Sequence, residues 1–372
     1  MEAATLAQDE LKEYLMRNLD YVRLVELQEK GWQNPAGDEF FEQRRQHFMN
    51  ADEKGQTMLF KMMTRIGEEI NASTGAFNLT NAMPNILDLC TAPGGFVKYA
   101  LQINPSAKVD ALSLPEQQGG YKIRVPFGGS DPRVSVCLTD ITLFADEFEL
   151  PNIFKDLKDD ANLAVHWPHK TTRYDIVICD GQVPRQNQIK DDHFEPLRLT
   201  YAQLYLGLKR VAPGGTMILL LHKSNRVTIF KLIHMFDQFS HVHIVKPTRS
   251  HATRSSFYLV AKNVQHQNPA CVKAMELFKL IWERATLKDE TAASALLYKD
   301  LCLVEKSLQP EIEEFGQRYI KLVRHTWKIQ ANALEKAPFA KGPAASRPIC
   351  THYLRGKCAY GEHCFKSHEV ER

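Results

Sequence analysis

The chain has 372 residues, of which 44% are hydrophobic and 24% charged, and its formal net charge is +3 with a pI near 8.3. This composition is close to the globular average, so we expect one sizeable domain with appendages or two domains. The mild basic balance permits nucleic-acid binding without requiring it. The N-terminal residues contain no apolar signal-peptide core, and runs such as Met217 to Leu221 are too short to cross a bilayer, so we expect no membrane segment.

Two stretches have apolar residues at helical spacing, one near each end of the chain. We interpret residues 1–53 as a helical N-terminal extension and residues 263–335 as a helical appendage, both packed on a central domain. The stretch 336–346 contains two prolines and a glycine and predicts a flexible linker.

Between these extensions, short apolar strands alternate with helices. The alternation predicts one α/β domain over residues 54–262, with a parallel sheet and right-handed crossovers. Residues 145–170 are expected to form an irregular, charged insertion. The predicted strands begin at Asn85 and continue with Ala107–Leu112, Val134–Leu138, Tyr174–Asp180, Thr216–Leu221, His241–Lys246 and Phe257–Ala261, and the predicted helices include Lys54–Ile70, Pro196–Val211 and Ile229–Phe239.

The stretch from Asn85 to Ala100 reads NILDLCTAPGGFVKYA and predicts a strand, a tight turn and a helix that opens at Phe96. At the carboxyl ends of parallel strands such a turn can bind a ligand, and its glycines let the ligand approach the backbone. The spacing matches neither the dinucleotide fingerprint nor the P-loop. An ordinary strand-to-helix turn is the alternative.

The segment LDLCTAPGGF resembles the first motif of the FtsJ/RrmJ-like methyltransferases, which methylate a ribose 2′-hydroxyl of RNA with S-adenosylmethionine. The resemblance implies a Rossmann-like S-adenosylmethionine-dependent methyltransferase sheet in which this loop holds the methionine end of the cofactor. Asp140 would bind the adenine amino group with Ile141 beside the ring, although a capping aspartate explains Asp140 equally well. The cofactor-binding residues that it implies are Asp88, Ala92, Pro93, Gly94, Gly95, Phe96, Asp140, Ile141 and Asp180.

Methyl transfer to a ribose hydroxyl needs a base and an aligned, partly deprotonated hydroxyl. A free lysine, with a pKa of about 10.4, is too protonated, but desolvation and a second ammonium lower that value. The resemblance places the family's Lys-Asp-Lys-Glu set on Lys61, Asp180 and Lys223, with Lys223 as the base. Lys61 otherwise reads as a surface lysine on a helix. The family's glutamate position holds Ser256, so a catalytically impaired RNA-binding or scaffold protein stays open beside the enzyme, as does, more weakly, methylation of a protein or small molecule.

The C-terminal stretch contains Cys350, Cys358, Cys364 and His368, separated by seven, five and three residues, which is the spacing of a CCCH zinc finger. Three thiolates and one imidazole complete a tetrahedral shell, so the predicted Zn²⁺ is structural. A disulfide cluster is the disfavoured alternative, because the other cysteines are scattered through apolar stretches, as expected of a cytoplasmic or nuclear protein.

RNA contacts are expected from two regions. Arg249 and Arg254 precede the last strand and could reach a phosphate. Fingers that resemble this one bind single-stranded RNA by stacking aromatic rings on bases, and the candidates for RNA contact here are Tyr353, Arg355, Tyr360 and Phe365. Phe365 directly follows the third cysteine instead of lying two residues beyond it, which leaves protein contact as the alternative. The expected partner is single-stranded or cap-proximal RNA, and no sequence feature indicates a protein partner.

Overall fold

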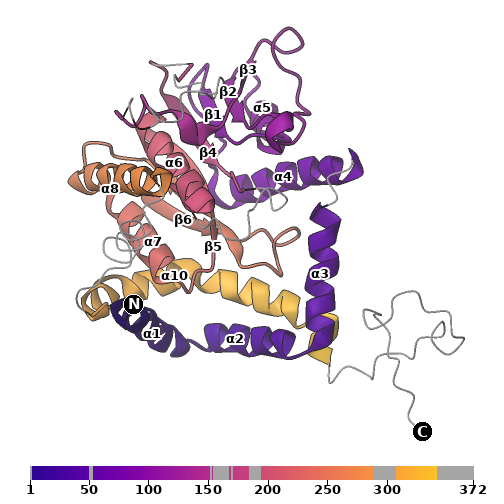
Figure 1. Cartoon of the computed structure of the whole chain (residues 1–372), viewed down its shortest axis with the longest axis vertical. Helices are drawn as coiled ribbons and strands as arrows, with labels where there is room; N and C mark the ends of the chain where they lie inside the picture. The colour runs from indigo at the N-terminus through magenta and orange to yellow at the C-terminus, as the bar shows by residue number, and fades with distance from the viewer. Residues whose placement is uncertain are drawn as a thin grey trace, which may run out of the picture.

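A computed structural model describes residues 2–49, 53–150, 153, 167–168, 171–183, 194–287 and 307–341. Within these residues the chain forms a seven-stranded sheet with helices on both faces, and a further layer of helices lies below it (Figure 1). Among the helices so described, none has the length and apolar character needed to cross a membrane.

Most of the strand ends lie within a few residues of their predicted positions. In chain order they are β1 (Asn85–Leu89), β2 (Lys108–Ser113), β3 (Val134–Leu138), β4 (Tyr174–Cys179), β5 (Val211–His222), β6 (His241–Val245) and β7 (Ser256–Lys262). Their order across the sheet is β3-β2-β1-β4-β5-β7-β6.

The sheet is mixed, so the expectation of a parallel sheet is wrong at one strand. β1 to β5 pair in parallel, whereas β7 runs antiparallel to both β5 and β6. A parallel pair needs a long crossover connection, usually through a helix. Residues 246–255 join β6 to β7 without one, so the chain reverses direction between them.

Alternate residues of each strand face two different apolar layers. On one face, Ile86 and its neighbours pack under α4 (Glu53–Thr74) and α5 (Gly95–Ile103). On the other face, Leu87 and its neighbours pack under α6 (Phe194–Arg210), α7 (Val227–Phe239) and α8 (Pro269–Thr286). Because both faces are covered, the central strands are almost continuously apolar. The short 3-10 helices are η1 (Glu116–Gln118), η2 (Ile141–Leu143) and η6 (Pro338–Lys341).

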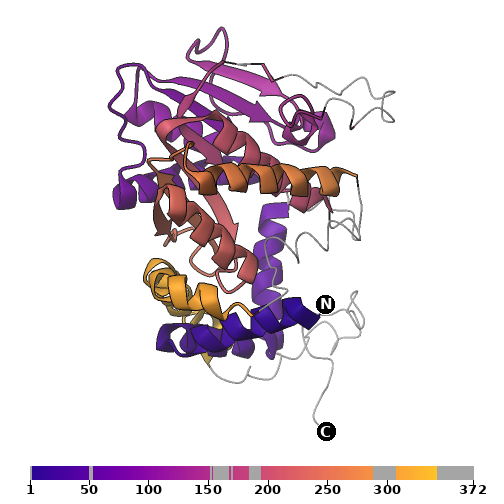
Figure 2. The ribbon, with the colours of Figure 1, turned by 90° about the vertical axis from the view of Figure 1, so that its left-hand side faces the viewer.

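Helices near the two ends of the described sequence meet in the second helical layer. α1 (Glu2–Met16), α2 (Leu19–Trp32) and α10 (Gln309–Leu334) lie together, and α3 (Pro35–Met49) runs from this layer up to α4 (Figures 1 and 2). Tyr21 and Trp327 join α2 to α10, with ring centroids 5.0 Å apart.

The ordered packing extends into the stretch expected to be a flexible linker. Phe339 is buried, and its ring lies 5.7 Å from that of Phe40 and 5.9 Å from that of Phe41. Residues 338–341 therefore belong to the folded helical layer, because an aromatic side chain is stabilised by burial in it. Residues 342–346 lie outside the described residues.

The helices α4 and α5 are in close contact at Gly95. A Cβ at this position would lie 2.4 Å from the carbonyl oxygen of Phe60 and 2.5 Å from Cβ of Met63. Such contacts force the backbone of one helix to move.

We therefore expect Gly95→Ala to lower the free energy of unfolding by about 1–3 kcal/mol, the usual cost of overpacking. Urea unfolding followed by circular dichroism would measure it. Gly129→Ala is the matched control, because no atom lies within 4 Å of the added Cβ, and its effect should stay within about 0.5 kcal/mol. Equal unfolding midpoints for the two variants would contradict the proposed contact.

Candidate active site

The carboxyl ends of β1 and β4 form the topological switch point of the sheet. The chain proceeds from β1 to β2 and β3 on one side and returns to β4 on the other. Ligands of open α/β sheets bind at such a crevice. Leu89 pairs with Cys179, so the turn after β1 and Asp180 after β4 are neighbours.

Asp88 is a buried carboxyl at this crevice. The hydroxyl of Thr91 donates to its Oδ2 at 2.7 Å, whereas Oδ1 is buried without a hydrogen-bond partner among the described residues. Burial raises the pKa of Asp88 to about 8, opposed by the Thr91 hydrogen bond and reinforced by the charge of Asp180. Ionisation of this carboxyl group is therefore costly, and its Oδ1 can still accept a hydrogen bond.

The turn after Asp88 has two left-handed residues, Cys90 with φ 69° and Gly94 with φ 99°. Gly94 precedes α5, which lacks a side-chain hydrogen bond at its N-cap, and a Cβ on Gly94 would lie 3.1 Å from Val125. The missing Cβ of Gly95 faces α4, so this glycine allows helix packing. The sequence predicts that both glycines make room for a ligand. For Gly95 the structure shows instead that the missing Cβ makes room for α4.

Asp180 is held from two sides. Tyr258 on β7 donates its hydroxyl to Oδ1 of Asp180 at 2.8 Å. The next residue, Gly181, donates its N–H to Oε1 of Gln203 at 2.8 Å and accepts from Nε2 at 3.1 Å. A Cβ on Gly181 would lie 2.5 Å from Sγ of Cys90, so glycine is required there. Burial raises the pKa of Asp180 to about 7, and the Tyr258 hydrogen bond opposes the shift.

Three predicted acids converge on Cys90. Burial raises the pKa of its thiol, and the charges of Asp140, Asp88 and Asp180 raise it further. Asp140 also accepts the N–H of Thr142 at 2.8 Å, as a capping aspartate does.

The other predicted cofactor residues lie close by. Ile141 and Phe96 are buried in the two apolar layers, and the Phe96 ring is 6.0 Å from that of Tyr258. Ala92 is partly buried, Pro93 is buried, and a cis peptide bond joins them. Their contacts with a cofactor stay predictions.

The two predicted catalytic lysines lie outside the hydrogen bonds that hold Asp180. Lys61 is exposed on α4. Because Cys179 pairs with Leu219, the position on β5 beside Asp180 is Leu220, and Lys223 follows three residues later. Lys223 is exposed and borders a small cavity of about 20 Å³ between the β5–α7 connection, α2 and α10. The catalytic roles of Lys61 and Lys223 beside Asp180 stay predictions.

Ser256, at the family's glutamate position, pairs with His222 across β5 and β7. Its hydroxyl is buried without a hydrogen-bond partner among the described residues. Lys246, which sequence reasoning had not singled out, is buried and donates Nζ to the carbonyl oxygens of Arg254 and Ser256, the latter at 2.7 Å. Burial, followed by the charge of Arg254, lowers the pKa of Lys246 to about 7.

Two histidines also lie at this edge. Nε2 of His222 is 3.2 Å from Oε1 of Gln182, two residues after Asp180. His251 is buried and stacks on Tyr258 with ring centroids 6.2 Å apart. Arg249 and Arg254 are exposed in the same loop. Their contact with a phosphate stays a prediction.

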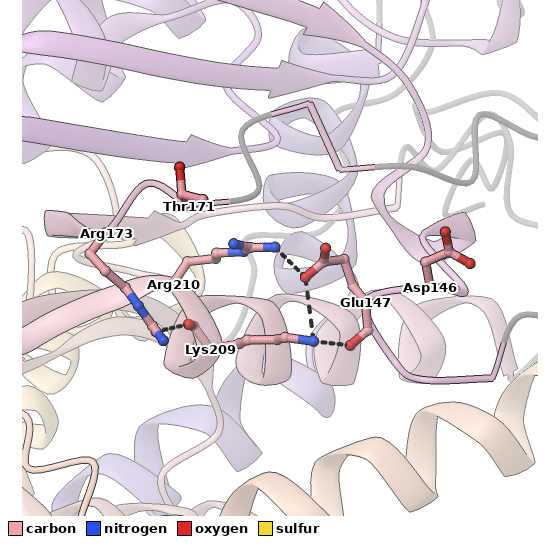
Figure 3. Close-up of a pocket in the computed structure, with 6 residues that line it drawn as sticks. All are labelled: Asp146, Glu147, Thr171, Arg173, Lys209 and Arg210. Atoms are coloured by element: carbon pink, nitrogen blue, oxygen red, sulfur yellow. Dashed lines mark hydrogen bonds and ion pairs between the residues drawn. The ribbon is translucent and has the colours of Figure 1, made fainter.

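A second cavity lies at the opposite edge of the sheet. It measures about 510 Å³ and is bordered by residues that precede β4 and end α6 (Figure 3). Glu147 pairs with Arg210 and, at 3.5 Å, with Lys209, while Arg173 donates to the carbonyl oxygen of Lys209 (Figure 3). Because these charges satisfy one another at the amino ends of the strands, we regard the cluster as structural.

The predicted zinc finger lies outside the described residues, together with its four ligands and the finger residues expected to contact RNA. Over the ranges that the structure describes, no three histidine, cysteine or acidic side chains gather as a metal site.

The raised pKa of Asp88 predicts how stability depends on pH. The folded state binds this proton more tightly than the unfolded chain, whose aspartates have a pKa of about 3.9. The contribution is therefore fully present below about pH 4 and is lost as the pH rises toward 8. We expect Asp88→Asn to unfold at a higher urea concentration than the wild type at pH 8, and this advantage to shrink toward pH 4.

Asp131→Asn is the control for this titration. Hydrogen bonds from Arg133 lower the pKa of the partly buried Asp131, so its contribution has the opposite sign. A pH-independent difference between Asp88→Asn and the wild type would show that Asp88 is not the titrating group.

The chain matches the family model of the FtsJ-like methyltransferases over residues 68–264, which begins just after Lys61. The "Probable methyltransferase EP424R" of African swine fever virus is 31% identical over 185 residues, which cover 47% of this chain and 43% of the viral protein. The ribosomal RNA large subunit methyltransferase E of Coxiella burnetii is 26% identical over 187 residues, which cover 50% of this chain and 77% of that protein. The matched region thus spans less than half the length of the viral relative.

The solved structures that match this chain include one of a Plasmodium falciparum protein described as a ribosomal RNA methyltransferase. It has 20% sequence identity, covers 54% of this chain and 96% of its own, and has a TM-score of 0.36. The family match extends over more than half of the chain and contains the strands β1 to β7. The chain belongs to the FtsJ-like methyltransferase family.

Proposed function

We propose that this protein transfers a methyl group from S-adenosylmethionine to a ribose 2′-hydroxyl of RNA. The observation that carries the proposal is the pair of carboxyl groups, Asp88 and Asp180, at adjacent strand ends on either side of the switch point. Membership of the family and the relatives' names support methyl transfer to RNA.

The residues present fit this cofactor. The unpartnered Oδ1 of Asp88 can accept a hydrogen bond from a ligand, and the uncapped start of α5 offers backbone N–H groups to a carboxylate. Asp88, the turn from Ala92 to Phe96 and Asp140 would hold it. When bound, S-adenosylmethionine supplies a methyl group activated by its sulfonium.

The chain's own residues would prepare the ribose. Tyr258 is hydrogen-bonded to Asp180, and Gln203 is hydrogen-bonded to the adjacent Gly181. Held in this way, Asp180 accepts a hydrogen bond and orients the hydroxyl or an ammonium. Lys223 receives the hydroxyl proton, and Lys61 places a second positive charge near it. Because Leu220 occupies the strand position beside Asp180, Lys223 has to reach back toward the site from the turn after β5.

A non-catalytic RNA-binding protein is the second candidate. Ser256 at the glutamate position and Leu220 beside Asp180 both favour it, since neither supplies charge to the reaction. In that case the sheet would bind S-adenosylmethionine and transfer nothing.

The test is transfer of labelled methyl from S-adenosylmethionine to total cellular RNA, followed by nucleoside analysis. We expect ribose-methylated nucleosides from the wild type and a loss of about 100-fold or more in Lys223→Ala and Asp180→Ala, because a base contributes about 10²–10⁴-fold. Lys108→Ala, an exposed lysine at the other edge of the sheet, should retain full activity.

Cofactor binding measured by calorimetry separates the two candidates. Binding without transfer in the wild type would favour the non-catalytic protein, and Ser256→Glu would then show whether the missing carboxylate is the cause. Full activity in Lys223→Ala would remove Lys223 as the base.

The C-terminal cysteines give a separate expectation. We propose that Cys350, Cys358, Cys364 and His368 bind one structural Zn²⁺ and that the finger captures RNA. Elemental analysis of the purified chain should find about one zinc per molecule, and Cys364→Ser should lose it, because four ligands complete the tetrahedral shell.

The same variant should bind single-stranded RNA more weakly in a fluorescence anisotropy assay, since the metal replaces a hydrophobic core in so short a segment. Cys137→Ser is the control and should keep both zinc and RNA affinity, because Cys137 is a free cysteine on β3. Zinc retained by Cys364→Ser would contradict the predicted ligand set.

A further inference from the structure

The last residue of β5 and the first residue of the turn to α7 are polar, His222 and Lys223. Lys223 has φ 57°, a left-handed conformation that costs a non-glycine residue about 1–2 kcal/mol. Such a backbone persists only where its surroundings hold it. Within the domain, its N–H donates to the carbonyl oxygen of Ser255 at 3.1 Å, and its own carbonyl oxygen accepts from Arg226 at 3.0 Å.

Helix α10 binds the next residue at two atoms. The hydroxyl of Tyr319 donates to the carbonyl oxygen of Ser224, and the indole N–H of Trp327 donates to the Ser224 hydroxyl at 2.9 Å. Tyr319 and Trp327 are 0% and 1% exposed, so both donors are buried. Loss of either donor would leave a buried oxygen of Ser224 without its hydrogen bond, which is unfavourable. The two hydrogen bonds therefore hold Ser224 in one orientation.

The N-terminal extension holds the same turn from α1. Nε2 of Gln8 donates to the carbonyl oxygen of Asn225 at 2.7 Å, and Oε1 of Gln8 accepts the N–H of Val227 at 3.3 Å. Arg226, at the N-cap of α7, provides no side-chain cap, so Gln8 caps this helix from a distant part of the chain.

A third hydrogen bond joins α10 to the loop before β7. Nε2 of Gln330 donates to the carbonyl oxygen of Thr253 at 3.4 Å, close to Arg254. The β5–α7 turn and the loop before β7 are therefore both hydrogen-bonded to the helical layer.

We propose that α1 and α10 are a positioning unit for the active site, in which Tyr319, Trp327 and Gln8 fix the turn that presents Lys223 to the substrate. This inference rests on the proposed methyl transfer. These three residues lie outside the matched range 68–264, so the helical layer adds a part that the family model does not contain. A base must be held in near-attack geometry, and a displacement of about 1 Å can cost about 100-fold in rate.

The test compares Tyr319→Phe, Trp327→Phe and Ser224→Ala in the full-length chain. Each removes one hydrogen-bonding group and keeps most of the packing. Trp282→Phe is the matched control, because Trp282 is equally buried and donates its indole N–H to the carbonyl oxygen of Thr142 at 3.1 Å, on α8 and away from the turn.

Hydrogen–deuterium exchange measures the turn directly. We expect amide exchange of residues 223–227 to accelerate about tenfold in Tyr319→Phe and Trp327→Phe, the factor that about 1.4 kcal/mol of lost protection produces. Trp282→Phe should leave it unchanged. Ser224→Ala combined with Trp327→Phe should exchange no faster than Trp327→Phe alone, because both partners of one bond are then absent.

Kinetics measure the consequence for the reaction. We expect kcat for RNA methylation to fall about tenfold in Tyr319→Phe and Trp327→Phe with an unchanged KM for S-adenosylmethionine, because the cofactor binds at β1 and β4. A general loss of structure would change both constants.

The outcomes separate this inference from the proposed function. Wild-type activity that Lys223→Ala abolishes and Trp327→Phe leaves intact would overturn the inference alone. Exchange in the turn that matches Trp282→Phe would overturn it whether or not methyl transfer occurs. A wild type that binds cofactor and methylates no RNA would refute the proposed function, and with it the presentation of a base.

Discussion

The parallel pairing of β1 with β4 is the constraint on which the candidate site depends. Its register places Leu89 opposite Cys179, and so it places the turn after Asp88 beside Asp180. Asp88 is fully buried there and Asp180 is partly buried, and the charge of Asp180 further disfavours ionisation of Asp88. The coupling is visible in Cys90, whose thiol has its pKa raised by burial and by three surrounding aspartates. A site of this kind is unfavourable when empty of positive charge and hydrogen-bond donors, and binding a ligand with both would relieve it.

Packing around the switch point is as restrictive as its electrostatics. Gly95 lets α4 approach α5, and Gly181 leaves room for Cys90 and the Gln203 side chain. Tyr258 belongs to β7, the strand that reverses direction, and its hydroxyl reaches Asp180 because β7 lies beside β5 in the sheet. The antiparallel strand thus contributes to the site even though the usual parallel pattern does not predict it.

The helical layer connects both ends of the described sequence to the candidate site. α1 and α10 come from opposite ends of the described sequence and bind one short turn between them. The left-handed backbone of Lys223 needs such support. The buried phenol of Tyr319 and indole of Trp327 supply it, because they have little freedom to rearrange. The family-matched domain supplies the sheet and the cofactor crevice, while the extensions supply the restraint on the turn.

Local patterns in the sequence determined the strands, the Asp88 turn and the resemblance to the FtsJ-like family, because alternation and glycine spacing are set by neighbouring residues. The pairing of Asp180 with Tyr258, 78 residues away, and of Ser224 with Trp327, 103 residues away, was decided by the tertiary structure alone. So were the direction of β7 and the burial of Phe339. A hydrogen bond between distant residues leaves no periodic signal in a single sequence, since only the folded chain brings donor and acceptor together.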